Sequence, residues 1–235
     1  MSRLSKSHRV PLLCYVTDRR ALSPREPARA RELVLEKIEA AARAGVDWIQ
    51  IREKDLGGRE LSALVQDALG RAKTGSRNKP KRAHRAAAVL VNDHLDVALA
   101  TRAGGVHLGE KGFPPQEARR LVRALHREKD FLIGVSCHSL EAAKNAEQAS
   151  ADYIFFGPVF VTPSKAAFGA PQGLERLAEV CRAVSIPVLA IGGVTRENCA
   201  ACLSEGASGI AAIRLFQDVE DIAAVVRALR KPKLD

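Results

Sequence analysis

The sequence predicts a single-domain α/β protein, a (β/α)8 TIM barrel, and three observations indicate it. Eight short apolar runs alternate with eight longer segments in which apolar residues recur at helical spacing. The short runs are apolar throughout, which is typical of parallel strands buried on both faces. Eight βα units with right-handed crossovers fit the 235 residues when the sheet closes on itself. An open, doubly wound sheet is the alternative, because a count of elements does not establish closure.

The expected strands are short and rich in β-branched and other apolar residues. They are Leu12–Thr17, Val46–Ile51, Ala88–Val91, Gly105–Leu108, Phe131–Ser136, Tyr153–Phe156, Pro187–Ile191 and Ser208–Ile213. A helix is expected after each strand. The helices are one around Leu33–Ala42, then Arg59–Arg71, Leu95–Arg102, Pro115–Arg127, Leu140–Ala149, Gly173–Val184, Arg196–Gly206 and Asp218–Leu229.

Several expected helices have residues suited to their ends. Pro114 and Pro115 open the fourth helix, where the N–H that proline lacks would have no partner in any case. Ser139 and Thr195 are suited to cap the fifth and seventh helices with a side-chain oxygen. Gly45 follows the first helix and suits the left-handed position that ends many helices.

Composition excludes several classes of protein. No stretch reaches the ~18 uninterrupted apolar residues of a membrane span, and the polar N-terminus lacks the apolar region of a secretory signal. Five scattered cysteines indicate reduced thiols in a cytoplasmic protein: Cys14, Cys137, Cys181, Cys199 and Cys202. The CxxC formed by Cys199 and Cys202 is expected inside the seventh helix and not at its start. We therefore expect it to pack, without a redox or zinc role.

The net charge of +10 is confined to two segments. Subtracting their nine basic residues from the total of 37 leaves 28, against 27 acidic residues. The nine are Arg3, Lys6, Arg9, Lys73, Arg77, Lys79, Lys81, Arg82 and Arg85. Neither segment has aromatic residues for stacking on bases, so no specific nucleic-acid site is expected beyond a nonspecific affinity for polyanions. We expect a flexible basic tail at 1–10, and a barrel at 11–235 with a basic loop insert at about 73–87.

Polar residues gather at the strand ends where (β/α)8 barrels have their active sites. On the second strand, Gln50, Arg52 and Lys54 share one face by the period of two. The other face has Ile49, Ile51 and Glu53. If the isoleucines pack on helices, an amide and two cations point into the barrel mouth. Buried cations need anionic partners. Two interpretations stay open, an anionic ligand or an internal network of ion pairs.

Three further strand ends have candidate functional residues. Asp93 is a candidate Mg²⁺ ligand or a helix cap. Thr162, Ser164 and Lys165 suit a phosphate in a mobile lid, or belong to an ordinary surface loop. His138 is a candidate general acid or base, or a structural histidine.

The last two strands end in residues suited to phosphate. Gly192 and Gly193 follow the seventh strand, where backbone N–H groups can approach an anion, and Arg214 follows the eighth. Barrels of this class often bind phosphate at these two strand ends.

Seven ordered blocks between Cys14 and Phe216 resemble the thiamin phosphate synthase/TenI superfamily. They are Tyr-Val-Thr-Asp (15–18), Gln-Ile-Arg-Glu-Lys-Asp (50–55), Val-Asn-Asp-His-Leu-Asp-Val-Ala-Leu-Ala (91–100), Gly-Val-His-Leu-Gly (105–109), Ile-Gly-Val-Ser-Cys-His-Ser-Leu (133–140), Phe-Phe-Gly-Pro-Val-Phe (155–160) and Ala-Ile-Gly-Gly-Val (190–194). The resemblance implies a (β/α)8 barrel. It also implies a transferase that joins hydroxymethylpyrimidine diphosphate to thiazole phosphate, giving thiamin phosphate and diphosphate.

The resemblance also implies roles for individual residues. Those implied to hold the pyrimidine diphosphate and Mg²⁺, with Asp93 as metal ligand, are Gln50, Arg52, Lys54, Asn92, Asp93, Ser136 and Lys165. Those implied to surround the thiazole phosphate are Thr162, Ser164, Gly193, Ile213 and Arg214. The implied catalytic residues are Arg52, Ser136, His138 and Lys165. Cations and metal would stabilise the departing diphosphate.

This chain departs from the family pattern at three places. Gly112 stands where the family has its second metal-binding Asp, and Glu110 or Lys111 is a candidate substitute. Arg214 stands where a serine is usual. The basic insert at 73–85 is expected at the opposite end of the barrel, away from the chemistry.

Three functions remain open from the sequence, with the synthase favoured. A TenI-like thiazole tautomerase, an isomerase, would need no metal and would use His138 as proton carrier. A non-catalytic phosphate-binding barrel is the third. We expect small phosphorylated partners, no specific nucleic acid, no membrane and a cytoplasmic location; a homo-oligomer is compatible with the sequence.

Overall fold

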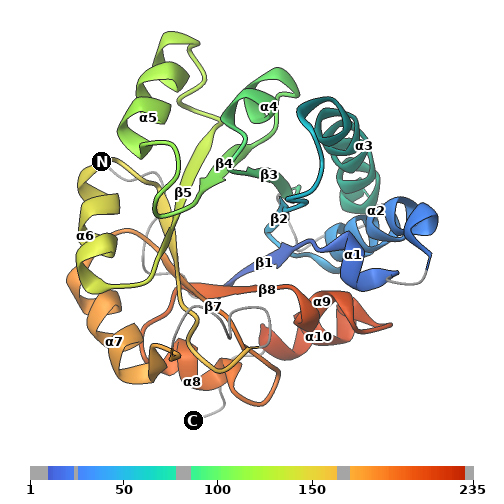
Figure 1. The fold of residues 1–235 in the computed structure, drawn as a ribbon. Helices are drawn as coiled ribbons and strands as arrows, with labels where there is room; N and C mark the ends of the chain where they lie inside the picture. The colour runs from blue at the N-terminus through green and yellow to red at the C-terminus, as the bar shows by residue number, and fades with distance from the viewer. Residues whose placement is uncertain (1–9, 24–25, 78–85, 163–169, 231–235) are drawn as a thin grey trace.

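The computed structural model describes residues 10–23, 26–77, 86–162 and 170–230, and its strands form a closed parallel barrel (Figure 1). The strands follow one another around the barrel in chain order, and β1 pairs with β8 to close it. The strands are β1 (Leu12–Val16), β2 (Trp48–Ile51), β3 (Ala88–Asn92), β4 (Gly105–Leu108), β5 (Leu132–Cys137), β6 (Tyr153–Phe156), β7 (Val188–Ile191) and β8 (Gly209–Ala212). The predicted barrel is confirmed, and the open sheet is excluded.

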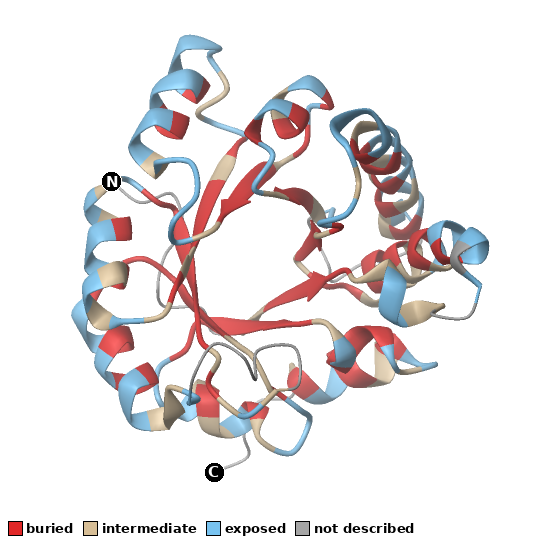
Figure 2. Ribbon diagram, viewed as in Figure 1, coloured by how far each residue is buried: buried red, intermediate tan, exposed pale blue. Residues whose placement is uncertain are grey.

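The helices form a ring outside the barrel (Figure 1). They are α1 (Arg19–Leu22), α2 (Pro27–Ala44), α3 (Gly58–Arg77), α4 (Leu95–Ala100), α5 (Pro115–Ala124), α6 (Leu140–Gln148), α7 (Gly173–Ala183), α8 (Cys199–Ser204), α9 (Arg214–Gln217) and α10 (Ile222–Leu229). Their inner faces are buried and their outer faces exposed (Figure 2). Within the described part of the chain, no helix is both long and apolar enough to cross a membrane.

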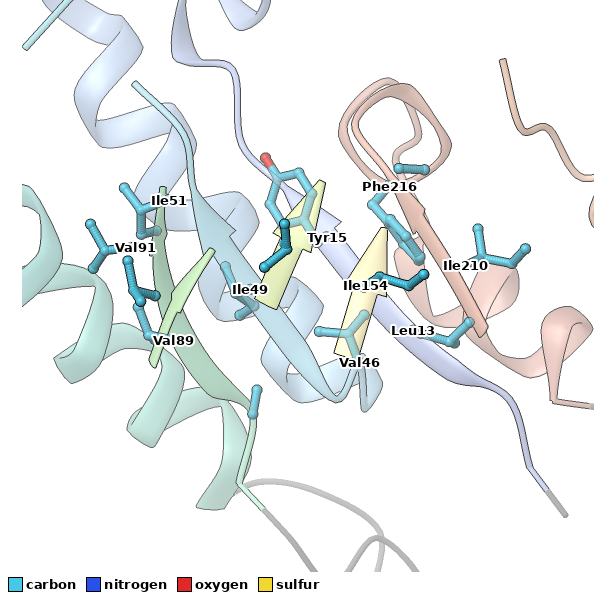
Figure 3. Close-up of a cluster of buried hydrophobic side chains, with 14 of the residues drawn as sticks. Leu13, Tyr15, Val46, Ile49, Ile51, Val89, Val91, Ile154, Ile210 and Phe216 are labelled. Carbon is cyan, nitrogen blue, oxygen red and sulfur yellow. The ribbon is translucent and has the colours of Figure 1, made fainter. Parts of the chain in front are cut away.

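The apolar side chains form two layers because neighbouring residues of a strand point to opposite faces. The outer layer lies between strands and helices and includes Leu13 and Tyr15 of β1 and Ile49 of β2 (Figure 3). The inner layer fills the barrel with Cys14, Val16, Trp48, Leu90, Tyr153, Phe155, Leu189 and Ala211. The barrel is therefore packed inside, and a ligand has room only at an end.

Gly134 on β5 allows the largest inner side chains to fit. A Cβ atom at Gly134 would lie 2.0 Å from Cζ of Tyr153, closer than any real contact. Without that atom, the Tyr153 ring packs with its centroid 4.5 Å from that of Trp48 and 5.4 Å from that of Phe155. Any larger residue at position 134 would push the Tyr153 ring out of the barrel interior.

Two aspartates fasten the amino-terminal ends of the strands in the same way. Oδ2 of Asp47, just before β2, accepts from Leu13 N at 2.8 Å and pairs with Arg230 at 2.7 Å. Oδ2 of Asp152, just before β6, accepts from Ile133 N at 2.7 Å and pairs with Arg119 at 2.5 Å. The second pair is buried, whereas the Asp47 pair is partly exposed.

The expected basic loop is shorter than predicted. α3 continues to Arg77, so Lys73 and Arg77 are helical. Gly75 explains why, because a Cβ there would lie 2.4 Å from the carbonyl oxygen of Glu39 on α2, so close packing of the two helices holds this last turn. The rest of the insert, like the basic tail, falls on residues 1–9 and 78–85, outside the described residues.

The prediction for the CxxC was wrong in its placement. α8 begins at Cys199 with Asn198 as N-cap, so the motif opens the helix, and Thr195 does not cap it. Asn198 Oδ1 accepts from Thr195 N at 2.8 Å, which holds residues 195–198 in a turn before the helix. Both thiols are buried, and burial raises the pKa of Cys202 to about 12. The expected packing is confirmed, since both side chains belong to the hydrophobic core.

Two other helical regions differ from expectation. Between β1 and α2 lies the additional short helix α1, which Asp18 caps by accepting from Ala21 N. The helix expected at 218–229 begins later, as α10, because Asp221 caps its start by accepting from Ala224 N at 2.9 Å, and the short helix α9 lies before the expected range. At α6 the predicted cap is confirmed, since Ser139 Oγ accepts from Ala142 N at 3.0 Å.

Candidate functional site

A chain of hydrogen bonds crosses the carboxyl ends of β2, β3 and β4. Gln50 Nε2 donates to Asn92 Oδ1 at 2.9 Å, and Asn92 Nδ2 donates to Asp93 Oδ2 at 2.7 Å. The other carboxylate oxygen, Asp93 Oδ1, accepts from Gly109 N at 2.7 Å. Asp93 has a φ of 58°, a conformation that Asp tolerates better than most residues. The structure thus brings together three residues predicted for the diphosphate and metal site.

Gln50 ends this chain with an unused acceptor. Gln50 is 2% exposed, and its Oε1 has no hydrogen-bond partner in the structure. An amide oxygen buried without a partner costs about 1–3 kcal/mol, which a ligand with an N–H group would recover. The amide of Gln50 is therefore prepared to accept a hydrogen bond from a bound molecule.

Arg52 and Lys54 lie beyond the strand that was expected to carry them. β2 ends at Ile51, so Arg52 is half-buried and Lys54 is exposed in the loop that follows. The placement of the isoleucines is confirmed, since Ile49 and Ile51 belong to the outer layer. Among the described residues, neither cation has an ion-pair partner. This observation favours an anionic ligand over the internal network of ion pairs.

Glu53 forms a buried clamp that the sequence analysis did not identify as functional. Its Oε1 accepts from Thr17 Oγ1 at 2.6 Å, and its Oε2 pairs with Arg19 at 3.1 Å. Thr17 Oγ1 in turn accepts from Arg52 N at 3.0 Å. Burial raises the pKa of the Glu53 carboxyl, while Thr17 and Arg19 lower it. The clamp fixes the backbone that carries the two free cations, and a hollow of about 370 Å³ lies beside it, lined by Asp18, Arg20, Arg52, Glu53, Lys54 and Asp55.

His107 lies inside the barrel below the mouth and was also missed. Its Nε2 lies 2.9 Å from Ser136 Oγ, and its Nδ1 lies 3.2 Å from the Tyr153 hydroxyl. The ring stacks on Phe155 with centroids 4.1 Å apart. Burial, and secondarily the charge of Arg52, lower the pKa of His107 to about 3. The imidazole is therefore neutral at physiological pH. Its position between outward-facing Val106 and Leu108 could have indicated that it points inward.

The metal position offers one carboxylate. A Cβ at Gly112 would lie 3.6 Å from Asp93 Oδ1, so the residue that departs from the family pattern is adjacent to Asp93. One oxygen of the candidate substitute Glu110, Oε2, accepts a hydrogen bond from His138 N at 2.7 Å. The described residues contain no cluster of three or more His, Cys, Asp or Glu side chains suited to a metal. Asp93 alone fits an Mg²⁺ ion that takes most of its ligands from substrate phosphate and water.

His138 follows β5 and is half-buried. Its Nδ1 is hydrogen-bonded to the carbonyl oxygen of Gly157, which begins the loop after β6. A carbonyl oxygen only accepts, so Nδ1 is the protonated nitrogen. This N–H is thus already bound within the protein, and a proton exchanged with a ligand would have to pass through Nε2.

The loop after β6 runs along the end of β7 and brings Thr162 towards the candidate phosphate residues. Val159 N donates to the Ile191 oxygen at 2.9 Å, and Phe160 N donates to the Gly192 oxygen at 3.0 Å. Gly193 has a φ of 68°, and a Cβ there would lie 2.6 Å from the Val161 oxygen. Only glycine fits this position. The paired glycines therefore leave room for the loop after β6 to pack against the end of β7. The sequence predicted an anion contact for these glycines and did not predict this packing role.

Four predicted residues remain, of which the structure describes two. Ile213 is half-buried at the end of β8, and Arg214 is exposed as the first residue of α9. Ser164 and Lys165 lie outside the described residues.

The fold and these side chains define a (β/α)8-barrel enzyme. Its mouth has two cations without an ion-pair partner among the described residues, a buried amide acceptor and the carboxylate of Asp93. Comparison with known proteins identifies the family within this class of enzymes. The chain belongs to the thiamine monophosphate synthase family (TMP-TENI), whose sequence model matches residues 13–216.

Individual relatives cover most of the chain. A putative thiamine-phosphate synthase of Geobacter sulfurreducens is 40% identical over 90% of this chain and 93% of its own. A thiamine-phosphate synthase of Chlorobium phaeobacteroides is 38% identical over 93% and 94%. A solved structure of thiamine phosphate pyrophosphorylase from Pyrococcus furiosus is 32% identical, covers 93% of both chains and has a TM-score of 0.73.

Proposed function

We propose that the protein is a thiamin phosphate synthase, a transferase that joins hydroxymethylpyrimidine diphosphate to thiazole phosphate. Membership of the family and relatives that cover the whole barrel support this reaction. The observation that carries the proposal is the buried, unpartnered Gln50 Oε1 at one end of the chain of hydrogen bonds that leads to Asp93. An aminopyrimidine with a diphosphate arm matches an amide acceptor close to free cations.

The pyrimidine is held at the inner end of the site. The exocyclic amine of the pyrimidine donates to Gln50 Oε1 and so removes the cost of the unpartnered oxygen. Ser136 Oγ, next to His107, offers a second polar contact at the end of β5. The ring then covers the packed aromatic layer below the mouth, which excludes water from one of its faces.

The diphosphate is held by cations that have no ion-pair partner among the residues that the structure describes. Arg52 and Lys54 bind the departing oxygens, and Lys165 is proposed to join them from the loop after β6. The bond between the methylene carbon and the diphosphate oxygen breaks, and both electrons leave with the diphosphate. Arg52 opposes the negative charge that grows on this leaving group, so it lowers the barrier as well as binding substrate.

Asp93 would hold Mg²⁺ together with the diphosphate oxygens, and Mg²⁺ would supply further positive charge there. The second carboxylate of the family pattern is missing, because Gly112 has no side chain, and we assign Glu110 to His138 N and not to the metal. The proposed dependence on Mg²⁺ is correspondingly weak.

Loss of the diphosphate leaves a positive pyrimidine-methyl group, which the thiazole nitrogen captures to form the new carbon–nitrogen bond. His107 matters here because its low pKa keeps the ring neutral and places no positive charge below this cation. The thiazole phosphate is proposed to lie between Thr162, Gly193, Ile213 and Arg214, with Ser164 from the same loop. This arrangement holds the nitrogen close to the carbon before water reaches it.

The variant Gln50→Leu tests the assignment of the pyrimidine. We expect kcat/KM for the pyrimidine diphosphate to fall on the order of tenfold or more, because a polar group of the substrate loses its partner. Inhibition by inorganic diphosphate should change less than about twofold, since Arg52 and Lys54 remain. Equal losses in both measurements would contradict the proposed orientation.

A further inference from the structure

Three successive loops at the barrel mouth are joined by two hydrogen bonds. Glu110, after β4, accepts from the backbone N–H of His138, after β5, at 2.7 Å. The side chain of His138 then donates through Nδ1 to the carbonyl oxygen of Gly157, after β6. Both bonds lie at the carboxyl ends of the strands, beside Asp93 on one side and the loop to Thr162 on the other.

We propose that Glu110 and His138 form a positioning bridge that holds the loop leading to Thr162 against the metal side of the site. His138 acts through its Nδ1–H and its backbone, and not as a proton carrier. This inference rests on the proposed synthase function, because it assigns the bridge to the placement of the two substrates.

The metal side of the bridge is rigid. Gly109 N donates to Asp93, and Glu110 is the next residue along the chain. Glu110 also lies close enough to the end of β5 to raise the pKa of the Cys137 thiol, after the larger effect of burial. The backbone of His138 is fixed in addition by Ser139, which caps α6. The position of Asp93 is thus transmitted to His138 by two hydrogen bonds, each between a side-chain carboxylate and a backbone N–H.

The loop side of the bridge has two attachments. On the β7 side, Val159 and Phe160 donate to Ile191 and Gly192. On the β5 side, Gly157 N donates to the Cys137 oxygen at 3.3 Å, and the Gly157 oxygen receives the His138 side chain. Loss of the His138 bond leaves only the long bond from Gly157 N to Cys137 on the β5 side, while β6 and β7 keep their pairing. We expect such a loss to misplace Thr162 and its neighbours without unfolding the barrel.

Two substitutions of similar size separate the bridge from proton transfer. An Asn side chain places its amide nitrogen where Nδ1 of histidine lies, whereas Gln places it where Nε2 lies. We expect His138→Asn to retain synthase kcat/KM within about threefold, because its amide nitrogen can still donate to Gly157. A variant that misplaced the loop by about 1 Å would lose far more activity than this. His138→Gln should lose tenfold or more, mainly as a higher KM for thiazole phosphate. His126→Asn is the matched control, since His126 is exposed at the end of α5 and has a φ of 52° that Asn tolerates.

The acidic half of the bridge has a parallel test. Glu110→Gln keeps an oxygen that accepts from His138 N, whereas Glu110→Ala removes it. We expect Glu110→Ala to raise the KM for thiazole phosphate as His138→Gln does, and Glu110→Gln to raise it much less. The Mg²⁺ concentration for half-maximal activity should be the same in Glu110→Gln as in the wild type. A severalfold increase would make Glu110 a metal ligand and overturn the bridge.

Nitrogen-15 NMR of histidine-labelled protein tests the bridge without any substrate. We expect the ring signals that disappear in His138→Asn to show a proton on Nδ1. The absence of a proton on Nδ1 would overturn the bridge, as would equal losses of activity in His138→Asn and His138→Gln. If the wild type makes no thiamin phosphate, the proposed function fails, while the NMR result still decides whether the bridge exists.

Discussion

Gly112 lies against Asp93, so closely that a Cβ at position 112 would be 3.6 Å from Asp93 Oδ1. The family resemblance alone gave the position of the missing carboxylate, and the structure shows that the two positions are neighbours in space. A side chain at 112 would meet the oxygen and nitrogen of Gly109 at 3.1 and 3.3 Å, so the loop must shift by a few tenths of an ångström to admit it.

Gly112→Asp should therefore strengthen Mg²⁺ binding. The added carboxylate attracts the metal at the Asp93 site, so we expect the Mg²⁺ concentration for half-maximal synthase activity to fall on the order of tenfold. The measurement is a Mg²⁺ titration of initial rates. Gly112→Ala introduces the same crowding without the charge and should show no such decrease. An unchanged titration in Gly112→Asp would place the metal away from Asp93.

Arg52→Ala should reduce kcat on the order of 10²- to 10³-fold, because it removes a charge that opposes the growing charge of the leaving group. Lys165→Ala should act in the same direction. Arg120→Ala is the control, since its side chain is 82% exposed on α5. Thermal unfolding should be similar in all three variants. Full activity in both Arg52→Ala and Lys165→Ala would contradict the placement of the diphosphate in this part of the mouth.

Asp152→Asn should destabilise the barrel more than Asp47→Asn, although both residues make the same contacts. Asp152 and Arg119 are 6% and 8% exposed, so the substitution leaves a buried cation without its partner. We expect a loss on the order of 3 kcal/mol in the free energy of unfolding, measured with urea. The Asp47 pair is about 30% exposed, and its loss should cost about 1 kcal/mol. Equal losses in the free energy of unfolding would show that burial does not determine how strongly each Asp–Arg pair stabilises the barrel.

His107 should make the fold sensitive to acid. Its pKa falls from 6.5 to about 3 on folding, so below about pH 6.5 the unfolded chain binds a proton that the folded chain does not. Stability should then decrease as the pH falls towards 3, by up to about 1.4 kcal/mol per pH unit from this group. His107→Asn should lose this part of the slope in urea unfolding measured from pH 7 to 4. The same substitution at exposed His126 should keep it. Parallel curves for wild type and His107→Asn would contradict the low pKa.

Strand alternation predicted much of the fold and the inner part of the site. Gln50 points inward between Ile49 and Ile51 because a buried parallel strand has a strict period of two. The same rule failed for Glu53, because β2 ends at Ile51 and the period has no meaning beyond a strand. The Glu53 clamp depends on Thr17 and Arg19, which are more than 30 residues away in the chain.

Helix starts were less predictable because side-chain contacts decide them. Thr195 and Asn198 are both suited to cap α8, and the hydrogen bond from Thr195 N to Asn198 Oδ1 selects the later start. The bond between Glu110 and His138 likewise joins residues 28 positions apart. No local sequence pattern indicates the start of α8 or the bond between Glu110 and His138.

The most direct test of the central claim is product formation by the purified protein. It is incubated with hydroxymethylpyrimidine diphosphate and thiazole phosphate at a series of Mg²⁺ concentrations, and thiamin phosphate and diphosphate are measured by chromatography. The account predicts both products in equal amounts, with rates that rise with Mg²⁺ and fall in Arg52→Ala. It is contradicted if neither product forms while the protein isomerises a thiazole carboxylate phosphate without metal, in a reaction that both His138→Asn and His138→Gln abolish.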